Sequence, residues 1–181
     1  MKDCIEAIEN RRSIRKFKEK AISKSDIEIL LNSAQMAPSA GNLQAREFII
    51  VSLKEGKKDL ARAALNQEFI RDSPVVIVIC ANMTRSESRY RMRSALYAIQ
   101  DATASVMNIL LAAHSLGLGA CWVGAFDERE VSSLLNLPEH VRPIALVPVG
   151  YPDEAPMAPS RLGERIEHWE KWVWDSDREG G

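Results

Sequence analysis

Three short segments, far apart along the chain, look like parts of one binding site for an anion and a ring. The first, residues 11–17 (RRSIRKF), places three guanidinium groups and one hydroxyl within five residues. Guanidinium groups bind phosphate through paired, charge-assisted hydrogen bonds. The segment therefore predicts a phosphate clamp made of Arg11, Arg12, Ser13 and Arg15.

The second segment supplies a polar loop, and the third supplies a glycine-rich turn. Residues 37–44 (APSAGNLQ) contain a glycine and the side-chain amides of Asn42 and Gln44, which suit the edge of a heteroaromatic ring. Residues 116–126 (LGLGACWVGAF) form a glycine-rich turn into a strand and out again, where backbone N–H groups can approach a ligand. Each segment alone also fits a plain structural role, as a solvated basic turn, an ordered loop or a tight turn.

The order, spacing and residue types of these segments resemble the nitroreductase family of FMN-dependent oxidoreductases, over about residues 5–165. The resemblance implies one α+β domain over residues 1–181, with a central mixed, mostly antiparallel sheet flanked by helices. It also implies an intertwined homodimer with an extended C-terminal tail, about residues 151–181, that wraps the partner. A small-molecule electron acceptor is the other partner that it implies.

The resemblance assigns the cofactor contacts residue by residue. It implies that Arg11, Ser13 and Arg15 hold the flavin phosphate and ribityl chain, and that Arg161 adds to the phosphate grip. Arg12 stays open, because alternate residues of an extended segment point opposite ways. The polar loop is expected to reach the flavin of the neighbouring subunit. The other implied contacts are Pro38, Ser39, Asn42, Gln44, Asn66, Gln67, Val123, Gly124 and Ala125.

The chain departs from the family pattern at several of these positions. Ala40 stands where the family usually has a second serine, and Ala45 and Arg46 stand where it usually has a proline and an aromatic residue. Some relatives carry an acidic side chain at the position of Gly124. Which amide of the pair Asn66–Gln67 faces the flavin stays open.

The implied reaction takes a hydride from NADH or NADPH onto FMN and passes electrons to a nitroaromatic, quinone or similar compound by a ping-pong mechanism. No side chain is assigned as catalytic: the flavin carries the chemistry, and the backbone N–H groups of Gly124 and Ala125 are expected near its N5. The three histidines read as structural or surface residues. The alternative is a protein of the same fold that binds a flavin or another phosphorylated ligand without turnover.

Composition narrows the class of protein. A net charge of −1 and a pI near 6.3 argue against a nucleic-acid or anionic-membrane binder, although positive charge gathers at residues 11–20 and 85–93. Three cysteines without a C-x-x-C pair argue against a disulfide framework or a metal site, and favour a reducing compartment, the cytoplasm. The longest apolar tract, residues 102–113, is too short and too polar to cross a membrane.

Periodicity predicts the elements that must position the three segments. Helices are expected at residues 3–10, 57–65, 94–115 and 128–135, with another that begins at a Ser25 cap and stops at Pro38. Strands are expected at residues 48–51, 74–80, 120–124 and 144–150. The helix at 94–115 is apolar almost all round, so we expect it inside the protein or at a subunit interface, with Gly117 as its cap. Three tryptophans of the tail, Trp169, Trp172 and Trp174, also need a covering surface.

Overall fold

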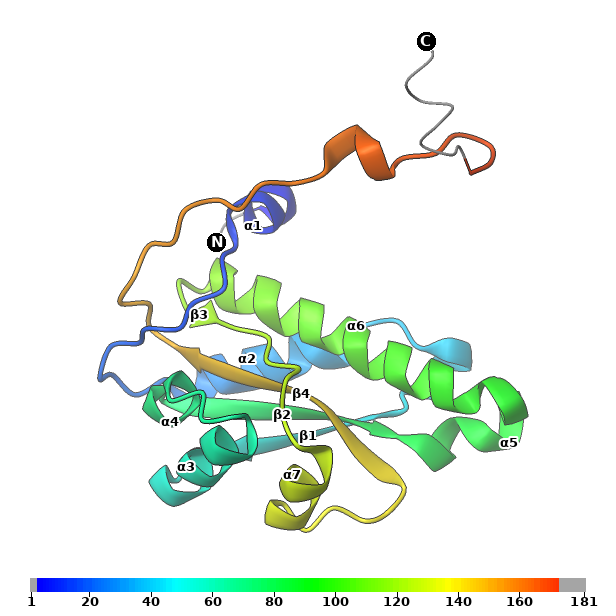
Figure 1. Ribbon diagram of the computed structural model, residues 1–181, viewed down its shortest axis with the longest axis horizontal. Helices are drawn as coiled ribbons and strands as arrows, with labels where there is room; N and C mark the ends of the chain where they lie inside the picture. The colour runs from blue at the N-terminus through cyan, green and yellow to red at the C-terminus, as the bar shows by residue number, and fades with distance from the viewer. Residues whose placement is uncertain (1–2, 173–181) are drawn as a thin grey trace.

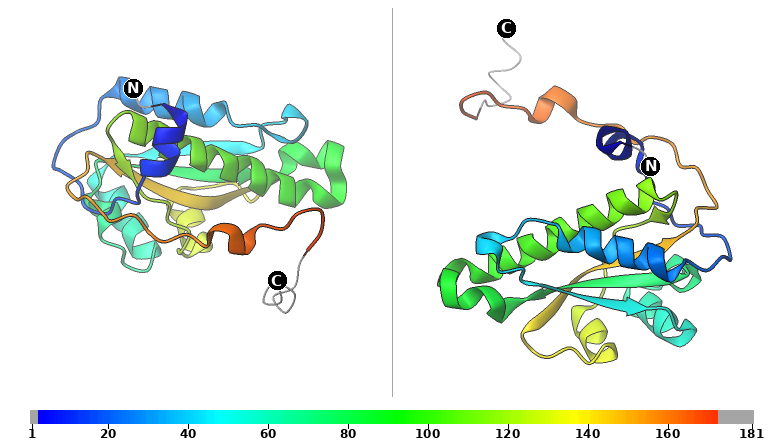
Figure 2. Two further views of the ribbon diagram at one scale, coloured as in Figure 1. Left: turned by 90° about the horizontal axis from the view of Figure 1, so that it is seen from above. Right: turned by 180° about the vertical axis from the view of Figure 1, so that it is seen from behind.

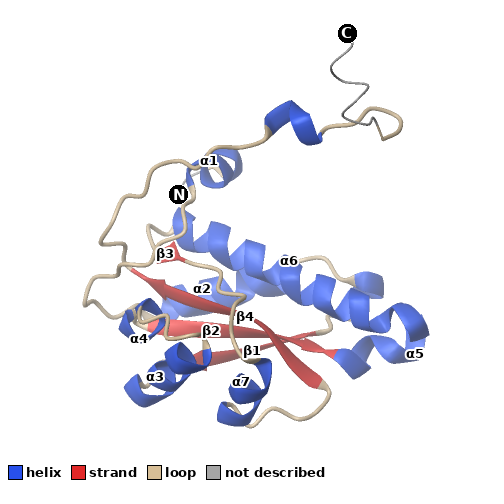
Figure 3. Ribbon diagram, in the orientation of Figure 1, coloured by secondary structure: helices blue, strands red, loops and turns tan. Residues whose placement is uncertain are grey.

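The computed structural model describes residues 3–172. They form three layers, with a four-stranded sheet between two layers of helices (Figures 1 and 3). The spatial order of the strands is β1-β2-β4-β3, and each neighbouring pair is antiparallel. An isolated parallel bridge joins Ser13 to Ala120 at the β3 edge. The strands are β1 (Arg46–Val51), β2 (Val75–Asn82), β3 (Gly119–Ala120) and β4 (Val141–Gly150). The predicted α+β fold with a mostly antiparallel sheet is therefore confirmed.

Helices cover both faces of the sheet (Figures 1 and 2). Helices α2 and α6 pack on one face, and α3, α4 and α7 contribute to the core on the other. The helices are α1 (Cys4–Asn10), α2 (Lys24–Gln35), α3 (Lys54–Ala63), α4 (Phe69–Asp72), α5 (Glu87–Tyr90), α6 (Ser94–Ser115) and α7 (Glu128–Leu134). Four 3-10 turns are Ala40–Asn42, Met83–Ser86, Arg91–Arg93 and Gly163–Ile166.

Strand β2 is the centre of the molecule. All eight of its residues are buried, and alternate side chains enter the two cores: Ile77 and Ile79 face α6, whereas Val76 and Val78 face the α3–α7 side. A run of β-branched residues suits this position, because such side chains pack well on a pleated surface that is covered on both sides. The prediction of a strand buried on both faces is confirmed.

Helix α6 spans the molecule and ends where the sequence predicts. Gly117 adopts a left-handed φ of 75° and donates to the carbonyl of His114, and Leu118 donates to the carbonyl of Ala113. These two bonds form a Schellman motif, which satisfies carbonyls at the helix end. By length and composition alone, residues 91–115 would also be long and apolar enough to cross a membrane. In this fold the inner face of the helix, with Ala102, Val106 and Ile109, forms part of the core.

Several predicted boundaries were wrong: β1, β2 and β4 run two or three residues beyond an expected end, and three further differences follow. Ser23, not Ser25, caps α2, because the Ser23 hydroxyl accepts from the backbone N–H of Asp26 at 3.0 Å. Helix α3 begins at Lys54, before the predicted start at residue 57. It ends at Ala63 because Leu65 and Asn66 are left-handed, with φ of 59° and 60°. The third predicted strand is shorter than residues 120–124, and its physical reason lies in β4.

The register between β3 and β4 continues past Ala120, but the ladder does not. Val123 and Leu146 form an isolated bridge, in line with the pairing of Ala120 and Val149. Between them Cys121 donates to the carbonyl of Pro148 at 3.3 Å, and Pro148 has no N–H to return the bond. The strand is therefore interrupted at this pair and resumes only at Val123.

The chain after Tyr151 leaves the sheet and extends beyond α1 (Figures 1 and 2). Its side chains are largely exposed within this one chain, including Met157, Trp169 and Trp172. Trp172 stacks on His168, with ring centroids 4.1 Å apart. Trp174, which the sequence analysis grouped with these tryptophans, lies outside the described residues. Wrapping of a partner by this tail stays a prediction.

Candidate functional site

A cavity of about 370 Å³ brings the predicted phosphate clamp together. Residues 11–15 supply one wall and the start of the C-terminal tail supplies the other, although more than 140 residues separate them in sequence. Among the residues that line this cavity, no side chain is acidic. The lining residues are Arg11, Arg12, Ser13, Arg15, Pro156, Met157, Pro159 and Arg161.

Close contact with β3 positions the clamp segment. The backbone N–H of Ile14 donates to the carbonyl of Ala120 at 3.0 Å, next to the parallel bridge from Ser13. A Cβ at Gly119 would lie 2.7 Å from the Ile14 side chain, which is closer than real Cβ contacts allow. Glycine at position 119 is therefore what permits residues 11–15 to lie along the sheet edge.

The tail is hydrogen-bonded to the same segment from the other side. Phe17 forms an antiparallel bridge with Pro152, and Asp153 donates its backbone N–H to the carbonyl of Lys16 at 2.9 Å. The carboxylate of Glu154 accepts from the backbone N–H groups of Arg15 and Lys16. These bonds fix the start of the tail, so that residues 156–161 close the cavity and bring Arg161 to the clamp.

Two arginines of the cavity, Arg12 and Arg161, each donate to a nearby backbone carbonyl. Arg12 uses Nη1 to donate to the carbonyls of Glu9 at 2.7 Å and Arg11 at 2.8 Å, which caps the end of α1. Arg161 donates to the carbonyl of Ser160 at 3.3 Å. Arg12 therefore caps α1 and also lines the cavity. Its contact with a phosphate stays a prediction.

Cys121 lies beneath the clamp. Burial raises the pKa of the Cys121 thiol, against the lowering effect of the Arg15 charge, a hydrogen bond with Ser13 and the Arg11 charge. The thiol is 1% exposed. A neutral, buried thiol at this place serves as packing beneath the cations, which agrees with the lack of a chemical role for Cys121 in the sequence analysis.

The structure brings Gln67, rather than Asn66, to the glycine-rich segment. The Gln67 side-chain amide donates to the carbonyl of Ala64 at 2.9 Å and to that of Ala125 at 3.1 Å. Asn66 is exposed at the left-handed end of α3. Two residues after Gln67, the centroid of the Phe69 ring lies 5.9 Å from Cζ of the Arg15 guanidinium. The junction of α3 and α4 therefore contacts both the clamp and the turn at Ala125.

Gly124 and Ala125 follow a firmly held residue and are themselves exposed. Val123 is 3% exposed and exchanges two backbone hydrogen bonds with Leu146, at 2.9 and 3.0 Å. A Cβ at Gly124 would meet nothing nearer than Trp122 Nε1 at 3.8 Å. The backbone of this turn is therefore anchored on one side and open on the other, as a set of donors to a ligand requires.

The polar loop at residues 38–44 lies away from the clamp within one chain. Asp101 anchors the loop from the first half of α6, whereas His114, near the C-terminal end, lines a cavity that shares Arg11 with the clamp. Thirteen residues separate Asp101 from His114. At about 1.5 Å per residue, these two positions of the helix lie roughly 20 Å apart. One chain alone does not combine the clamp and the loop in a single site.

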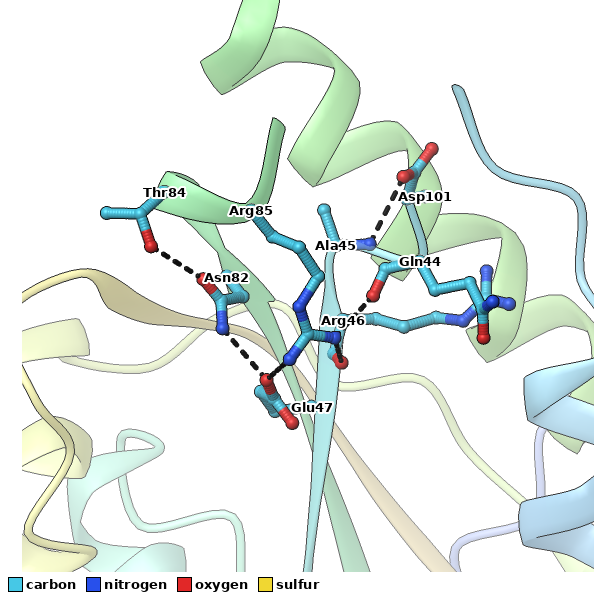
Figure 4. Close-up of polar contacts among 8 residues, drawn as sticks. All are labelled: Gln44, Ala45, Arg46, Glu47, Asn82, Thr84, Arg85 and Asp101. Atoms are coloured by element: carbon cyan, nitrogen blue, oxygen red, sulfur yellow. Dashed lines mark hydrogen bonds and ion pairs between the residues drawn. The ribbon is translucent and has the colours of Figure 1, made fainter. Parts of the chain in front are cut away.

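Three charged residues to which the sequence assigned no part in the site hold this loop (Figure 4). The buried carboxylate of Asp101 accepts from the backbone N–H groups of Ala40 at 2.9 Å and Ala45 at 3.3 Å. The buried Arg46 donates to three carbonyls at the end of α2, those of Gln35, Ala37 and Pro38. Desolvation lowers the pKa of Arg46, while the nearby Asp101 raises it.

Arg85 completes the support of the loop. It donates to the carbonyl of Gln44 at 2.6 Å and pairs with the carboxylate of Glu47. Asn82 also donates to Glu47, at 2.8 Å, and Thr84 donates to Asn82 at 3.1 Å (Figure 4). A charged residue within an apolar helix, Asp101, was the one available sequence signal, because burial of an acid is rare unless it is hydrogen-bonded.

The fold and the site define an α+β protein with a cationic pocket that several arginines line. The model of the Nitroreductase family matches residues 8–67 and 61–151. The chain belongs to this family.

Relatives and solved structures agree with that membership. The chain is 37% identical to an Archaeoglobus fulgidus protein named for NADH dehydrogenase and NAD(P)H nitroreductase, over 95% of this chain and 100% of the relative. It is 32% identical to the FMN reductase (NADPH) of Bacillus subtilis, over 84% of this chain and 67% of that protein. The structure of B. megaterium NfrA2 matches with a TM-score of 0.90 and 32% identity, over 98% of this chain and 78% of that one.

Proposed function

We propose that this chain takes a hydride from NADH or NADPH onto FMN and reduces a second small molecule, a nitroaromatic, quinone or similar compound. The observation that carries the proposal is the cavity where Arg11, Ser13, Arg15 and Arg161 converge, with no acidic side chain among the residues that line it. Several guanidinium groups and a hydroxyl around one space fit a phosphate monoester. The enzyme is thus an NAD(P)H-dependent flavin oxidoreductase with FMN as its cofactor.

The names of the relatives support the class of reaction. Two Bacillus subtilis relatives are FMN reductases, and a Vibrio harveyi relative is an NADPH-flavin oxidoreductase. The V. harveyi enzyme was solved in complex with NAD⁺, and that structure matches with a TM-score of 0.87 and 27% identity, over 97% of this chain and 81% of that one. These names support nicotinamide and flavin as the two redox groups.

The residues of this chain divide the work. When bound, FMN supplies hydride acceptance at N5 and the return of electrons to the acceptor. The clamp holds the phosphate end, and the turn at Gly124 and Ala125 offers fixed backbone donors for the ring. Gln67 holds the carbonyl of Ala125 in place. The polar loop offers the side chains of Ser39, Asn42 and Gln44 as hydrogen-bond partners for the flavin ring.

The site is complete only in a homodimer. The loop contacts the first half of α6 and the clamp lies near its C-terminal end, so the loop serves the clamp of a partner subunit. The outer face of α6 exposes Leu96 (44%) and Met107 (40%), and a second copy would cover them. A two-fold interface uses the same surfaces twice and yields two equivalent sites.

Three thiols, none in a disulfide, agree with a cytoplasmic enzyme.

Ping-pong kinetics follow from a single shared face of the flavin. The sequence has no G-x-G-x-x-G turn that opens a helix, so donor and acceptor take turns at the same place. The test is anaerobic titration of the purified yellow protein with NADPH, followed by steady-state assays with a quinone. Bleaching of the flavin and parallel double-reciprocal lines are expected. Flavin that binds but is not reduced by either donor would favour the binding-protein alternative.

A further inference from the structure

A second basic cluster lies at the end of the molecule that holds the polar loop. Residues 85–93 contain four arginines and one glutamate, in a chain whose net charge is −1. Arg85 is paired with Glu47. Arg89, Arg91 and Arg93 are exposed, and among the side chains that the structure describes none of the three forms an ion pair with a carboxylate. Three uncompensated cations therefore share one short segment, the arginine trio.

Two members of the arginine trio lie close to aromatic rings. The guanidinium of Arg89 lies 5.7 Å from the ring centroid of Tyr90, and that of Arg93 lies 5.1 Å from the ring of Tyr97. The two tyrosines contact each other edge to face, at 4.8 Å, and Arg93 also donates to the Tyr97 hydroxyl at 2.9 Å. Stacking on a ring holds a guanidinium in a defined plane while its N–H groups stay available to an anion.

Backbone geometry between these pairs is unusual. Arg91 has a φ of 41°, a left-handed value that is uncommon for a residue other than glycine. Next to it, the side chain of Met92 is 99% exposed. Strained backbone persists where the surrounding structure determines it, and it gathers at ligand sites.

The trio is attached directly to the polar loop. A Cβ at Gly41 would lie 2.6 Å from the Tyr90 hydroxyl and 2.9 Å from Arg89 Nη1, so the ends of these two side chains lie against the loop. Arg85 ties the same segment to the carbonyl of Gln44. Under the proposed function, on which this inference rests, the loop reaches the partner's flavin. The trio then lies at the entrance to that flavin.

We propose that Arg89, Arg91 and Arg93 bind the 2′-phosphate of NADPH and so make NADPH the preferred hydride donor. The first basic cluster is committed to the FMN phosphate at the other end of the subunit, which leaves the trio as the cation source beside the donor. A 2′-phosphate is a dianion on the adenosine half of the molecule, and NADH lacks it. Guanidinium groups discriminate such a group by charge and paired hydrogen bonds.

The experiment compares the FMN-loaded wild-type enzyme with the triple variant Arg89→Gln, Arg91→Gln, Arg93→Gln. We expect wild type to favour NADPH in kcat/KM, and the triple variant to lose about tenfold to a hundredfold with NADPH while the NADH value changes little. Arg129→Gln removes an exposed arginine from α7 as the matched control and should leave the donor ratio unchanged. Equal loss with both donors, or wild-type preference for NADH, would overturn the assignment.

A binding measurement separates this inference from the proposed function. Calorimetry with adenosine 2′,5′-bisphosphate and with 5′-AMP reports the 2′-phosphate contact without turnover. The bisphosphate should bind the wild type at least tenfold more tightly, and the triple variant should lose that difference. Intact discrimination in an enzyme that oxidises neither donor would support the trio and refute the proposed reaction. The single variant Arg91→Gln, whose side chain has no hydrogen bond or ion pair among those described, should show a smaller loss in the same direction in a chain that folds normally.

Discussion

The side-chain amide of Gln67 donates a hydrogen bond of 3.1 Å to the carbonyl of Ala125, across 58 residues of sequence. The same amide also donates to Ala64, so its position is fixed from two sides. The carbonyl of Ala125 lies in one peptide plane with the N–H of Phe126, so this bond holds the turn on the C-terminal side of Ala125. Gln67 therefore acts as a positioning residue for the turn that we assign to the flavin ring.

Replacing Gln67 tests this role. Gln67→Ala should lower the rate of flavin reduction about tenfold, because small displacements of a reacting group are costly. It should lower the free energy of unfolding by only about 1 kcal/mol, since the lost bond is partly exposed. Asn66→Gly is the matched control: it removes the neighbouring amide and keeps a φ of 60° that glycine accepts. Stopped-flow absorbance at the flavin band measures both variants, and equal rates for them would refute the role.

Removing one cation from the clamp should weaken FMN more than riboflavin. Arg15→Ala and Arg161→Ala each delete a guanidinium from the cavity, and a charge-assisted bond contributes about 1.5–3 kcal/mol. FMN affinity should therefore fall about tenfold to a hundredfold, while riboflavin, which has no phosphate, should be affected little. Lys16→Ala removes an adjacent exposed charge that does not line the cavity. Flavin fluorescence titration distinguishes the three variants, and equal losses for both flavins would contradict the clamp.

The elements that surround the clamp were predictable because their signals are local. Periodicity placed β2 and α6, and the left-handed glycine at position 117 marked the helix end. The 3-10 and α-helical turns at residues 83–93 were missed, because segments of three or four residues carry almost no periodic signal. The early end of the third strand also escaped, since it depends on Pro148 in a strand that lies far along the chain.

The members of the clamp were predictable, but the support of the polar loop was not. Arg11, Ser13, Arg15 and Arg161 share one cavity as the resemblance implied, and their contact with FMN stays a prediction. The loop depends on Asp101, 61 residues from Ala40, and such long-range side-chain bonds leave no spacing to detect. Arg46 reads from sequence as a missing aromatic residue, whereas its position shows that it caps α2.

Asp101 should be essential to the shape of the loop. Asp101→Asn keeps the size of the side chain but turns one acceptor into a donor, so one of the N–H groups of Ala40 and Ala45 loses its partner. The expected loss is about 1–3 kcal/mol in the free energy of unfolding. FMN should also be held less tightly in the dimer. Denaturant unfolding and flavin retention measure the two effects, and Ser105→Ala, one turn further along α6, serves as a control in the same core.

Stability should decrease with pH on the alkaline side because of a buried thiol. Burial raises the pKa of the Cys80 thiol from 9.0 to about 12, and the charge of Glu47 adds to the shift. Between these values the unfolded chain loses a proton that the folded chain keeps, so folding becomes less favourable as pH rises. The contribution is about 1.4 kcal/mol per pH unit within that window. Cys80→Ala should show a shallower slope between about pH 9 and 10 in denaturant titrations. Cys4→Ala, an exposed cysteine on α1, should match the wild-type slope.

Dimer formation and flavin retention should be lost together when the outer face of α6 becomes charged. Met107 lies 40% exposed on a helix whose inner face is core, and a carboxylate at this position would be buried without a partner in a dimer. Met107→Glu should therefore shift the protein towards monomer at micromolar concentration and release FMN, because a ligand bound across an interface stabilises it. Leu53→Glu, at an exposed leucine beside α3, adds the same charge elsewhere and should leave both properties unchanged.

Sedimentation velocity with absorbance detection at the protein and flavin bands follows both properties in one run. Truncation before Trp169 should act in the same direction as Met107→Glu, because the tail then loses apolar side chains that are exposed in a single chain. The two changes affect different surfaces, and only a shared interface links them to one outcome. A stable monomer that carries stoichiometric FMN would show instead that the polar loop is not needed at the clamp, and that each chain holds its flavin alone.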